Sequence, residues 1–243
     1  METVYADNHI IVVNKAPGEI VQGDKTGDEP LSETVKAWIK EKYNKPGNVF
    51  LGVVHRLDRP VGGLVVFART SKALTRLNEM FRNGQVHKRY WALSRTAPAA
   101  PEGELHQWLT SVEARNKSFV SDTQRPGAKE ARLRYKVLGR SDSFNLIEVE
   151  LLTGRKHQIR CQLAAAGCPI RGDLKYGDRR SNPDGSISLL AHEIEFTHPV
   201  SGKTIHLFAP LPADAPWRSF NALHNQMTSK GQVGTSLCDV SPA

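Results

Sequence analysis

The sequence has few cysteines, and none of them are spaced as a pair. Its 243 residues include three, Cys161, Cys168 and Cys238, and no CxxC motif. An odd count without paired spacing favours neither a disulfide framework nor a zinc site. We therefore expect free thiols in a reducing, cytoplasmic environment and no metal.

Long apolar runs are also missing. A run such as LVVFA, residues 64–68, is far shorter than the roughly 20 residues that cross a bilayer. The opening METVYADNHIIVV has no basic segment before a long apolar one, so we expect no signal peptide and no membrane attachment. GxGxxG, a Walker loop and metal-ligand spacing are absent, which predicts no cofactor.

Positive charge is in excess. The formal net charge is +8 and the isoelectric point is about 9.5. Such an excess favours a polyanionic partner, with nucleic acid ahead of an anionic membrane. A soluble protein that is merely basic fits the charge alone equally well.

Hydrophobic periodicity predicts an α+β fold with a mixed, mostly antiparallel sheet and inserted helices. Residues 1–224 are expected to form one domain, followed by a disordered tail over 225–243 that is rich in small polar residues. The expected strands are 10–13, 63–70, 86–94, 130–139, 144–152 and 187–197, and the expected helices are 31–45 (N-cap Ser32), 71–84 and 154–167.

The first candidate site is the stretch GVVHRLDRPVGGLVVFART. Asp58 lies there between Arg56 and Arg59, so its carboxylate is expected to stay ionised and to act as a nucleophile or charge stabiliser. The glycine pair at 62–63 allows a sharp bend and a close approach to a ligand. An ion-paired surface turn is the simpler interpretation of the same residues.

Two further segments combine positive charge with chemistry. In HKRYWALS, Tyr90 follows Lys88 and Arg89, and an aromatic ring beside cations suits stacking on a base. In TGRKHQIRCQL, four basic residues crowd the start of the predicted helix, where the helix dipole is already positive, so an anion is needed there. A half-buried strand tyrosine and a solvated cationic face are the alternatives.

Together these segments resemble the RluA-type pseudouridine synthases. HRLDRPVGG is similar to that family's aspartate motif, GRKHQIR to its Gly-Arg-x-His-Gln-Ile-Arg motif, and GCPIRGDLKYG to the segment that follows. NKAPG, HKRYWALS and EFTHP resemble the family's early lysine element, tyrosine strand and late His-Pro element. The matches run from about Asp7 to Pro210.

The sequence departs from the family pattern at several positions. Val61 and Gly62 replace a threonine and a serine, so hydrogen bonding around the aspartate must differ. Ala16 replaces a common proline, and Gln162 and Leu190 replace frequent histidines. The strand HIIVVNK begins close to Met1, so we expect no N-terminal RNA-binding module.

The resemblance implies isomerisation of uridine to pseudouridine in ribosomal or transfer RNA, within a central RNA-binding cleft. It assigns catalysis to Asp58, Tyr90 and Arg155, with Arg155 paired to the aspartate. The RNA-binding residues it implies are Arg56, Arg59, Lys88, Arg89, Lys156, His157, Ile159 and Arg160. A monomer without an obligatory protein partner is the default.

Two rival functions stay open. A glycoside hydrolase also uses an aspartate at a sugar carbon, but most such enzymes need a second carboxyl group, and no partner is evident. A synthase-like protein that binds RNA without turnover is suggested by the altered Val61-Gly62 segment.

Overall fold

A computed structural model describes residues 1–231. The chain divides into two compact units. The first comprises Met1–Val86, Ala191–Pro210 and the segment from Gln226; the second comprises His87–Leu190 and Leu211–Asn225. The first unit is therefore assembled from separate parts of the sequence.

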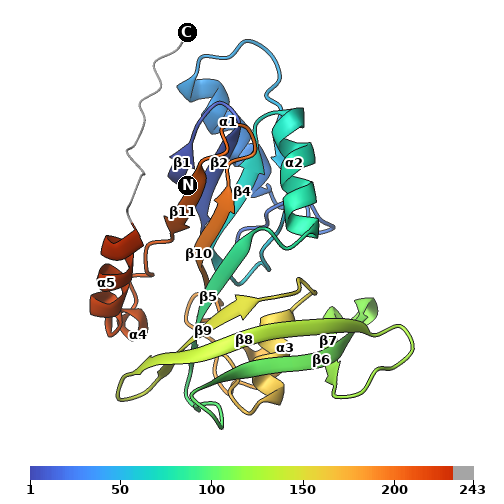
Figure 1. Ribbon diagram of the computed structural model, residues 1–243, viewed down its shortest axis with the longest axis vertical. Helices are drawn as coiled ribbons and strands as arrows, with labels where there is room; N and C mark the ends of the chain where they lie inside the picture. Colours follow the sequence, from blue (N-terminus) through green and yellow to red (C-terminus); the bar gives the residue numbers. More distant parts are fainter. Residues whose placement is uncertain (232–243) are drawn as a thin grey trace. The chain divides into compact units, whose positions relative to one another are not determined.

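The first unit is built on the strand order β1-β2-β4-β10, with β3 beside β4 and β11 beside β10 (Figure 1). Strand β4 is buried along its whole length, and β2 pairs with it in antiparallel register. This burial explains why both segments are nearly continuous apolar runs. The elements are β1 (Glu2–Ala6), β2 (Ile10–Lys15), α1 (Leu31–Lys42), β3 (Gly52–Val53), β4 (Gly62–Ala68), α2 (Ser71–Arg82), β10 (Leu189–Thr197) and β11 (Thr204–Phe208).

The second unit has the antiparallel order β5-β9-β8-β6-β7. Its helix α3 contacts β6 and β7, where Cys161 packs in a small core with Leu109 and Ala131. The elements are β5 (His87–Ser94), β6 (Glu102–Val112), η1 (Glu113–Arg115), β7 (Lys117–Ser121), β8 (Lys129–Arg140), β9 (Asn145–Leu151), α3 (Gln158–Ala165), η2 (Leu174–Tyr176), α4 (Ala215–Arg218) and α5 (Asn221–Gly231).

The predicted fold class is confirmed, because helices are inserted between strands and most of the strand pairs are antiparallel: β1–β2, β2–β4, β3–β4 and β10–β11 in the first unit, and β5–β9, β9–β8, β8–β6 and β6–β7 in the second. The predicted pairing of 130–139 with 144–152 is the β8–β9 hairpin. The expected N-cap of the first helix was wrong. Ser32 lies inside α1, and Pro30, with extended backbone, occupies the N-cap position.

The expected disorder from Asn225 was wrong for its first residues. Helix α5 continues to Gly231, and the remainder of the predicted tail, 232–243, lies outside the described residues. Within residues 1–231, every helix is too short or too polar to cross a bilayer.

Candidate active site

Asp58 lies in a tight turn between β3 and β4. The amide of Val61 donates to the carbonyl of Asp58 at 3.0 Å and closes this turn. The amide of Gly18 donates to the carbonyl of Arg59 at 2.8 Å, which joins the turn to the end of the NKAPG segment. Asp58 is partly exposed. The turn therefore offers a carboxylate on a fixed backbone.

The glycine pair behind Asp58 is required by packing. Gly63 has φ +113°, and a Cβ there would lie 2.4 Å from the carbonyl oxygen of Ala191 on β10. A Cβ on Gly62 would lie 3.3 Å from the Pro17 ring. The glycines thus let β4 begin in close contact with two neighbouring segments. The severe contact is at Gly63, where the chain keeps the family's glycine, and the altered Gly62 has only a close contact with Pro17.

A buried lysine supports the Asp58 turn from below. The ammonium of Lys15 donates to the carbonyls of Ala16 (2.9 Å), Arg59 (3.1 Å) and Val61 (2.8 Å). Its side chain is almost fully buried. Burial lowers the pKa of Lys15 to about 8, against the opposing effect of the Glu19 and Asp58 carboxylates. The lysine therefore brings a positive charge into electrostatic contact with Asp58 and fixes the part of the loop that follows it.

Lys15 was missed as a site residue by the sequence reasoning. Its position offered a signal, because Lys15 lies two residues after the buried run Ile10–Val13, at the end of the same strand. A lysine that is buried in such a place must have partners. Its partners are carbonyls of a distant turn, which the sequence does not identify.

The two arginines that flank Asp58 differ in their side-chain contacts. Arg59 places its Nη2 atom 2.6 Å from Asp28 Oδ2 and 2.9 Å from Thr26 Oγ1. Arg56 is exposed, and its side chain has neither an ion pair nor a hydrogen bond within residues 1–231. Arg56 is therefore the more available of the two for RNA, and the RNA-binding role of Arg59 stays a prediction.

Tyr90 lies on β5, opposite Val149 of β9, and is 7% exposed. Lys88 precedes it on the same face of the strand and is partly buried, so desolvation lowers the pKa of Lys88.

Arg89 lies on the other face of β5, opposite Glu150. It lines a groove of about 370 Å³ together with Glu102, Glu104, Glu148 and Glu150. Arg134 and Lys136 line the same groove, where Arg134 pairs with Glu104 and Glu150 and Lys136 pairs with Glu102, so the groove is of mixed charge. Arg89 does not share a strand face with Lys88, and its RNA contact stays a prediction.

The basic segment before α3 is a turn and not the first part of the helix. Helix α3 begins at Gln158, because His157 adopts the left-handed conformation with φ +56°. The expectation that Arg155, Lys156 and His157 lie within the helix was therefore wrong. Because these residues precede the helix, their local contacts and their exposure determine whether each one can bind an anion.

Gln158 shapes the turn that carries Arg155. Its Oε1 atom accepts from the amide of Arg155 (3.0 Å) and from the hydroxyl of Thr153 (2.9 Å). Its Nε2 atom donates to the carbonyl of Arg132 at 3.0 Å. The exposed Arg155 side chain donates through Nε to the carbonyl of Glu130 at 2.8 Å. The guanidinium therefore retains further donors for an anion.

The other side of this turn is held by a buried tyrosine. The hydroxyl of Tyr176 lies 2.8 Å from Nδ1 of His157 and accepts from the amide of Ser118 at 2.8 Å. The Ser118 hydroxyl donates to the carbonyl of Lys156 at 2.7 Å. Burial raises the pKa of Tyr176 to about 12, so its hydroxyl stays protonated. His157 is thus buried in a protein network, and the predicted RNA contact by its side chain is not supported.

Arg160 was expected to bind a phosphate, and this expectation was wrong. Its side chain is buried, with Nε 2.7 Å from Asp173 Oδ2 and Nη2 2.9 Å from Asp173 Oδ1. Its guanidinium also lies 5.1 Å from the centroid of the Tyr176 ring. This two-point ion pair joins α3 to the GDLKYG segment. Ile159 is buried beside it, and its predicted contact with a base stays a prediction.

One group within the described residues has metal-ligand spacing. The ligand atoms of Glu193, Glu195 and His206 lie within 4.8 Å of one another on β10 and β11. His206 Nε2 lies 2.7 Å from Glu193 Oε1, which is the geometry of an ion pair.

The predicted catalytic residues belong to different units. Asp58 is in the first, and Tyr90 and Arg155 are in the second. The ion pair between Asp58 and Arg155 therefore stays a prediction.

Comparisons with known sequences agree with the motifs. The family model described as RNA pseudouridylate synthase matches residues 9–165. The ribosomal large subunit pseudouridine synthase C of Vibrio vulnificus is 31% identical over 220 residues, covering 86% of this chain and 65% of that protein. The corresponding synthase D of Xylella fastidiosa is 32% identical over 227 residues, covering 88% and 67%. The chain thus spans about two thirds of the length of these relatives.

A solved structure shares the fold. Human RNA pseudouridylate synthase domain containing 4 superposes with a TM-score of 0.72 over 94% of this chain and 93% of that chain, at 23% identity. The family model and the sequence relatives confirm what the RluA-type motifs predicted: the chain belongs to the RNA pseudouridylate synthase family.

Proposed function

We propose that this protein is a pseudouridine synthase that isomerises uridines in ribosomal RNA. Family membership carries the reaction, and the relatives named as ribosomal large subunit synthases support the substrate. The arrangement around Asp58 supports the chemistry, because a fixed turn presents a carboxylate beside the buried Lys15 ammonium. A monomer acting in the cytoplasm without a cofactor is part of the proposal.

In the proposed reaction the bond between the ribose and a base nitrogen breaks, the base turns, and a base carbon joins the same sugar carbon. That base carbon loses its proton and the freed nitrogen gains one, so the overall change is an isomerisation. Asp58 acts at the sugar carbon, either as nucleophile or by assisting a glycal-like intermediate. Lys15, and Arg155 through the proposed ion pair, supply the positive charge that faces this carboxylate during the reaction.

The other residues handle the nucleotide. Tyr90 stacks on the uracil and removes the proton from the new attachment carbon. Arg56, which is exposed, holds the flipped nucleotide or enters the duplex in its place. Flipping costs a few kcal/mol, which phosphate contacts such as Lys156 offset.

A release assay tests the proposal. The protein is incubated with ribosomal RNA that carries tritium on the uracil carbon that forms the new bond, and release of label to water is measured. We expect release by the unmodified protein and only background release by Asp58→Asn. Asp28→Asn is the matched control, because this exposed aspartate pairs with Arg59, and it should release label at nearly the unmodified rate.

The outcomes separate the rival functions. RNA binding without release would establish the RNA-binding module instead of the synthase. Liberation of free base would indicate a hydrolase. Pseudouridine maps of ribosomal and transfer RNA, from cells with and without the protein, should show a lost site in ribosomal RNA; a loss confined to transfer RNA would contradict the proposed substrate.

A further inference from the structure

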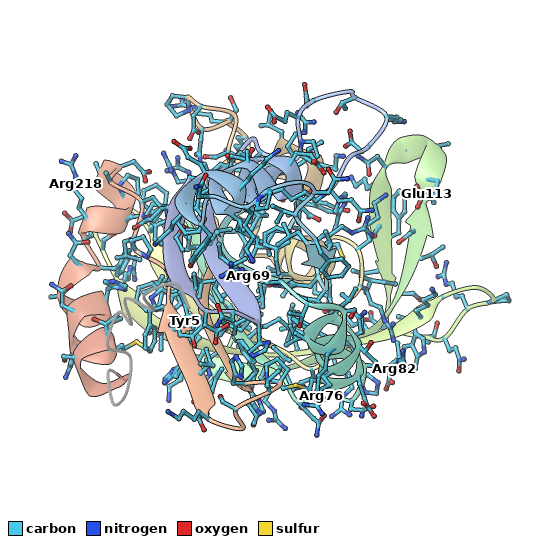
Figure 2. The ribbon with its side chains drawn as sticks, turned by 90° about the horizontal axis from the view of Figure 1, so that it is seen from above. Tyr5, Arg69, Arg76, Arg82, Glu113 and Arg218 are labelled. Atoms are coloured by element: carbon cyan, nitrogen blue, oxygen red, sulfur yellow. The ribbon has the colours of Figure 1, made fainter. Side chains whose placement is uncertain are left out.

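The hairpin of β6 and β7 carries a basic surface that the catalytic assignments do not use. Figure 2 shows Glu113 on this hairpin, which turns through η1. Two neighbouring segments meet it: Lys175 donates to the carbonyl of Asn116 at 2.9 Å, and Lys156 lies 3.5 Å from Glu113. We call this surface the hairpin patch; it comprises Arg115, Lys117, Phe119, Lys156 and Lys175.

Positive charge dominates the hairpin patch. Of its four cations, Lys156 pairs with the exposed Glu113. Arg115 and Lys117 have no ion pair within residues 1–231. A purely structural set of surface lysines would more often be balanced by neighbouring acids. This imbalance favours an anionic ligand.

An exposed aromatic ring lies beside one of these cations. Phe119, on β7, is 39% exposed. The Lys117 ammonium lies 5.7 Å from the centroid of the Phe119 ring and 5.2 Å from that of Tyr176. An accessible ring beside ammonium groups is the composition of a platform for unpaired nucleotides.

The hairpin patch is also tied to the turn that carries Arg155. Ser118, between Lys117 and Phe119, contacts the carbonyl of Lys156 through its hydroxyl and the hydroxyl of Tyr176 through its amide. A ligand held by Lys117 and Phe119 would therefore be connected through Ser118 to the backbone next to Arg155.

We infer that the hairpin patch binds an unpaired stretch of the substrate RNA. A base stacks on Phe119, and the adjoining phosphates contact Arg115, Lys117 and Lys175. RNA fits better than an acidic peptide, because a stacking ring between cations matches alternating bases and phosphates. The inference rests on the proposed function for its choice of ligand, but it concerns binding and not turnover.

The test measures binding in the Asp58→Asn background, where turnover is removed. Filter binding of fragmented ribosomal RNA is compared for this parent and for parents that also carry Phe119→Ala, Phe119→Trp or Lys117→Gln. Phe50→Ala is the matched control, because Phe50 is a similarly exposed phenylalanine, at 48%, in the first unit. Thermal melting verifies that each variant is folded.

We expect Phe119→Ala to weaken binding between about fivefold and a hundredfold, the effect of losing one stacked base. Phe119→Trp should retain binding. Lys117→Gln should reduce the slope of log affinity against log salt by about 0.7, as loss of one phosphate contact predicts. Phe50→Ala should bind like the parent.

Unchanged affinity for Phe119→Ala together with an unchanged salt slope for Lys117→Gln would overturn the inference. Equal losses for Phe119→Ala and Phe50→Ala would overturn it as well, and so would RNA-independent capture of an acidic protein by the same residues. These outcomes are independent of the release assay. Binding by the hairpin patch without tritium release would refute the proposed synthase and leave the RNA-binding surface established.

Discussion

The Tyr176 hydroxyl lies 2.8 Å from Nδ1 of His157, and the same oxygen accepts the amide of Ser118 at 2.8 Å. Because the amide donates to this oxygen, the tyrosine's own hydrogen is available to the imidazole. One buried hydroxyl therefore joins three segments: the β7 strand, the η2 turn and the turn that carries Arg155. It acts on Arg155 through His157, two residues further along the chain.

Tyr176→Phe should remove this connection and keep the ring over Arg160. The buried Ser118 amide loses its acceptor, so we expect the free energy of unfolding to fall by about 1–3 kcal/mol. The turnover number should fall more than the Michaelis constant rises, because Arg155 is displaced while RNA-binding residues remain. Thermal melting and release kinetics measure both effects.

Tyr135→Phe is the control, since this half-buried hydroxyl has no hydrogen bond within residues 1–231. It should leave turnover and stability nearly unchanged. If Tyr176→Phe lowers stability without lowering the turnover number at a temperature where it is folded, Tyr176 does not position Arg155.

Lys15 should give the reaction an alkaline limit. Burial lowers its pKa to about 8, so the positive charge beside Asp58 is lost above that pH. We expect the turnover number to decline with an apparent pKa near 8. A pH–rate profile of the unmodified protein measures this, and a flat profile through pH 9.5 would contradict it.

The lowered pKa of Lys15 also makes the stability of the fold depend on pH. The folded pKa lies below the ordinary value of 10.5, so between about pH 8 and 10.5 the unfolded chain binds more protons at Lys15 than the folded chain does. The contribution of this group to stability therefore rises with pH across that window, by up to about 3 kcal/mol. The denaturation midpoint of the unmodified protein should therefore rise with pH across that window relative to the midpoint of Lys15→Met.

Gly63→Ala should be strongly destabilising. The added Cβ would lie 2.4 Å from a backbone oxygen of Ala191, in a strand that cannot yield locally. We expect a loss of more than about 3 kcal/mol in chemical denaturation. Gly18→Ala separates sterics from backbone conformation: its φ is +92°, but open space surrounds the new Cβ. It should cost only about 1–2 kcal/mol, and equal losses at both positions would refute the steric argument.

Arg160 and Arg56 should behave in opposite ways. Arg160→Met leaves the Asp173 carboxylate buried without its guanidinium, so stability should fall by about 3–5 kcal/mol while the salt dependence of RNA binding stays unchanged. Arg56→Gln, at an exposed position, should leave stability unchanged and reduce the salt slope by about 0.7. A reduced slope for a folded Arg160 variant would restore its role as a phosphate contact.

Local pattern was sufficient for much of the fold. The continuous apolar run of β4 and the alternating β8–β9 pair depend on burial of near neighbours, which hydrophobic periodicity reports directly. The short β3 strand depends on its pairing with β4, which the sequence does not encode locally. Likewise α5 extends into a polar segment whose composition favoured disorder.

In the candidate site, too, local pattern predicted some features while distant contacts determined others. Motif order predicts catalytic roles for Asp58, Tyr90 and Arg155, but it could not tell exposed cations from buried ones. Arg160 is paired with Asp173, thirteen residues away, and Lys15 is hydrogen-bonded to carbonyls more than forty residues away. A positive φ at His157, which makes the predicted helix begin later, is also invisible to charge and periodicity.

The left-handed backbone at His157 separates Arg155 from the geometry of α3. A residue inside a helix rotates by about 100° about the axis for each inserted or deleted position. Arg155 is exempt from that rotation, because its turn is anchored to Thr153, Gln158 and Tyr176 instead. An insertion or deletion within α3 beyond Gln158 would therefore leave the turn that carries Arg155 anchored as it is.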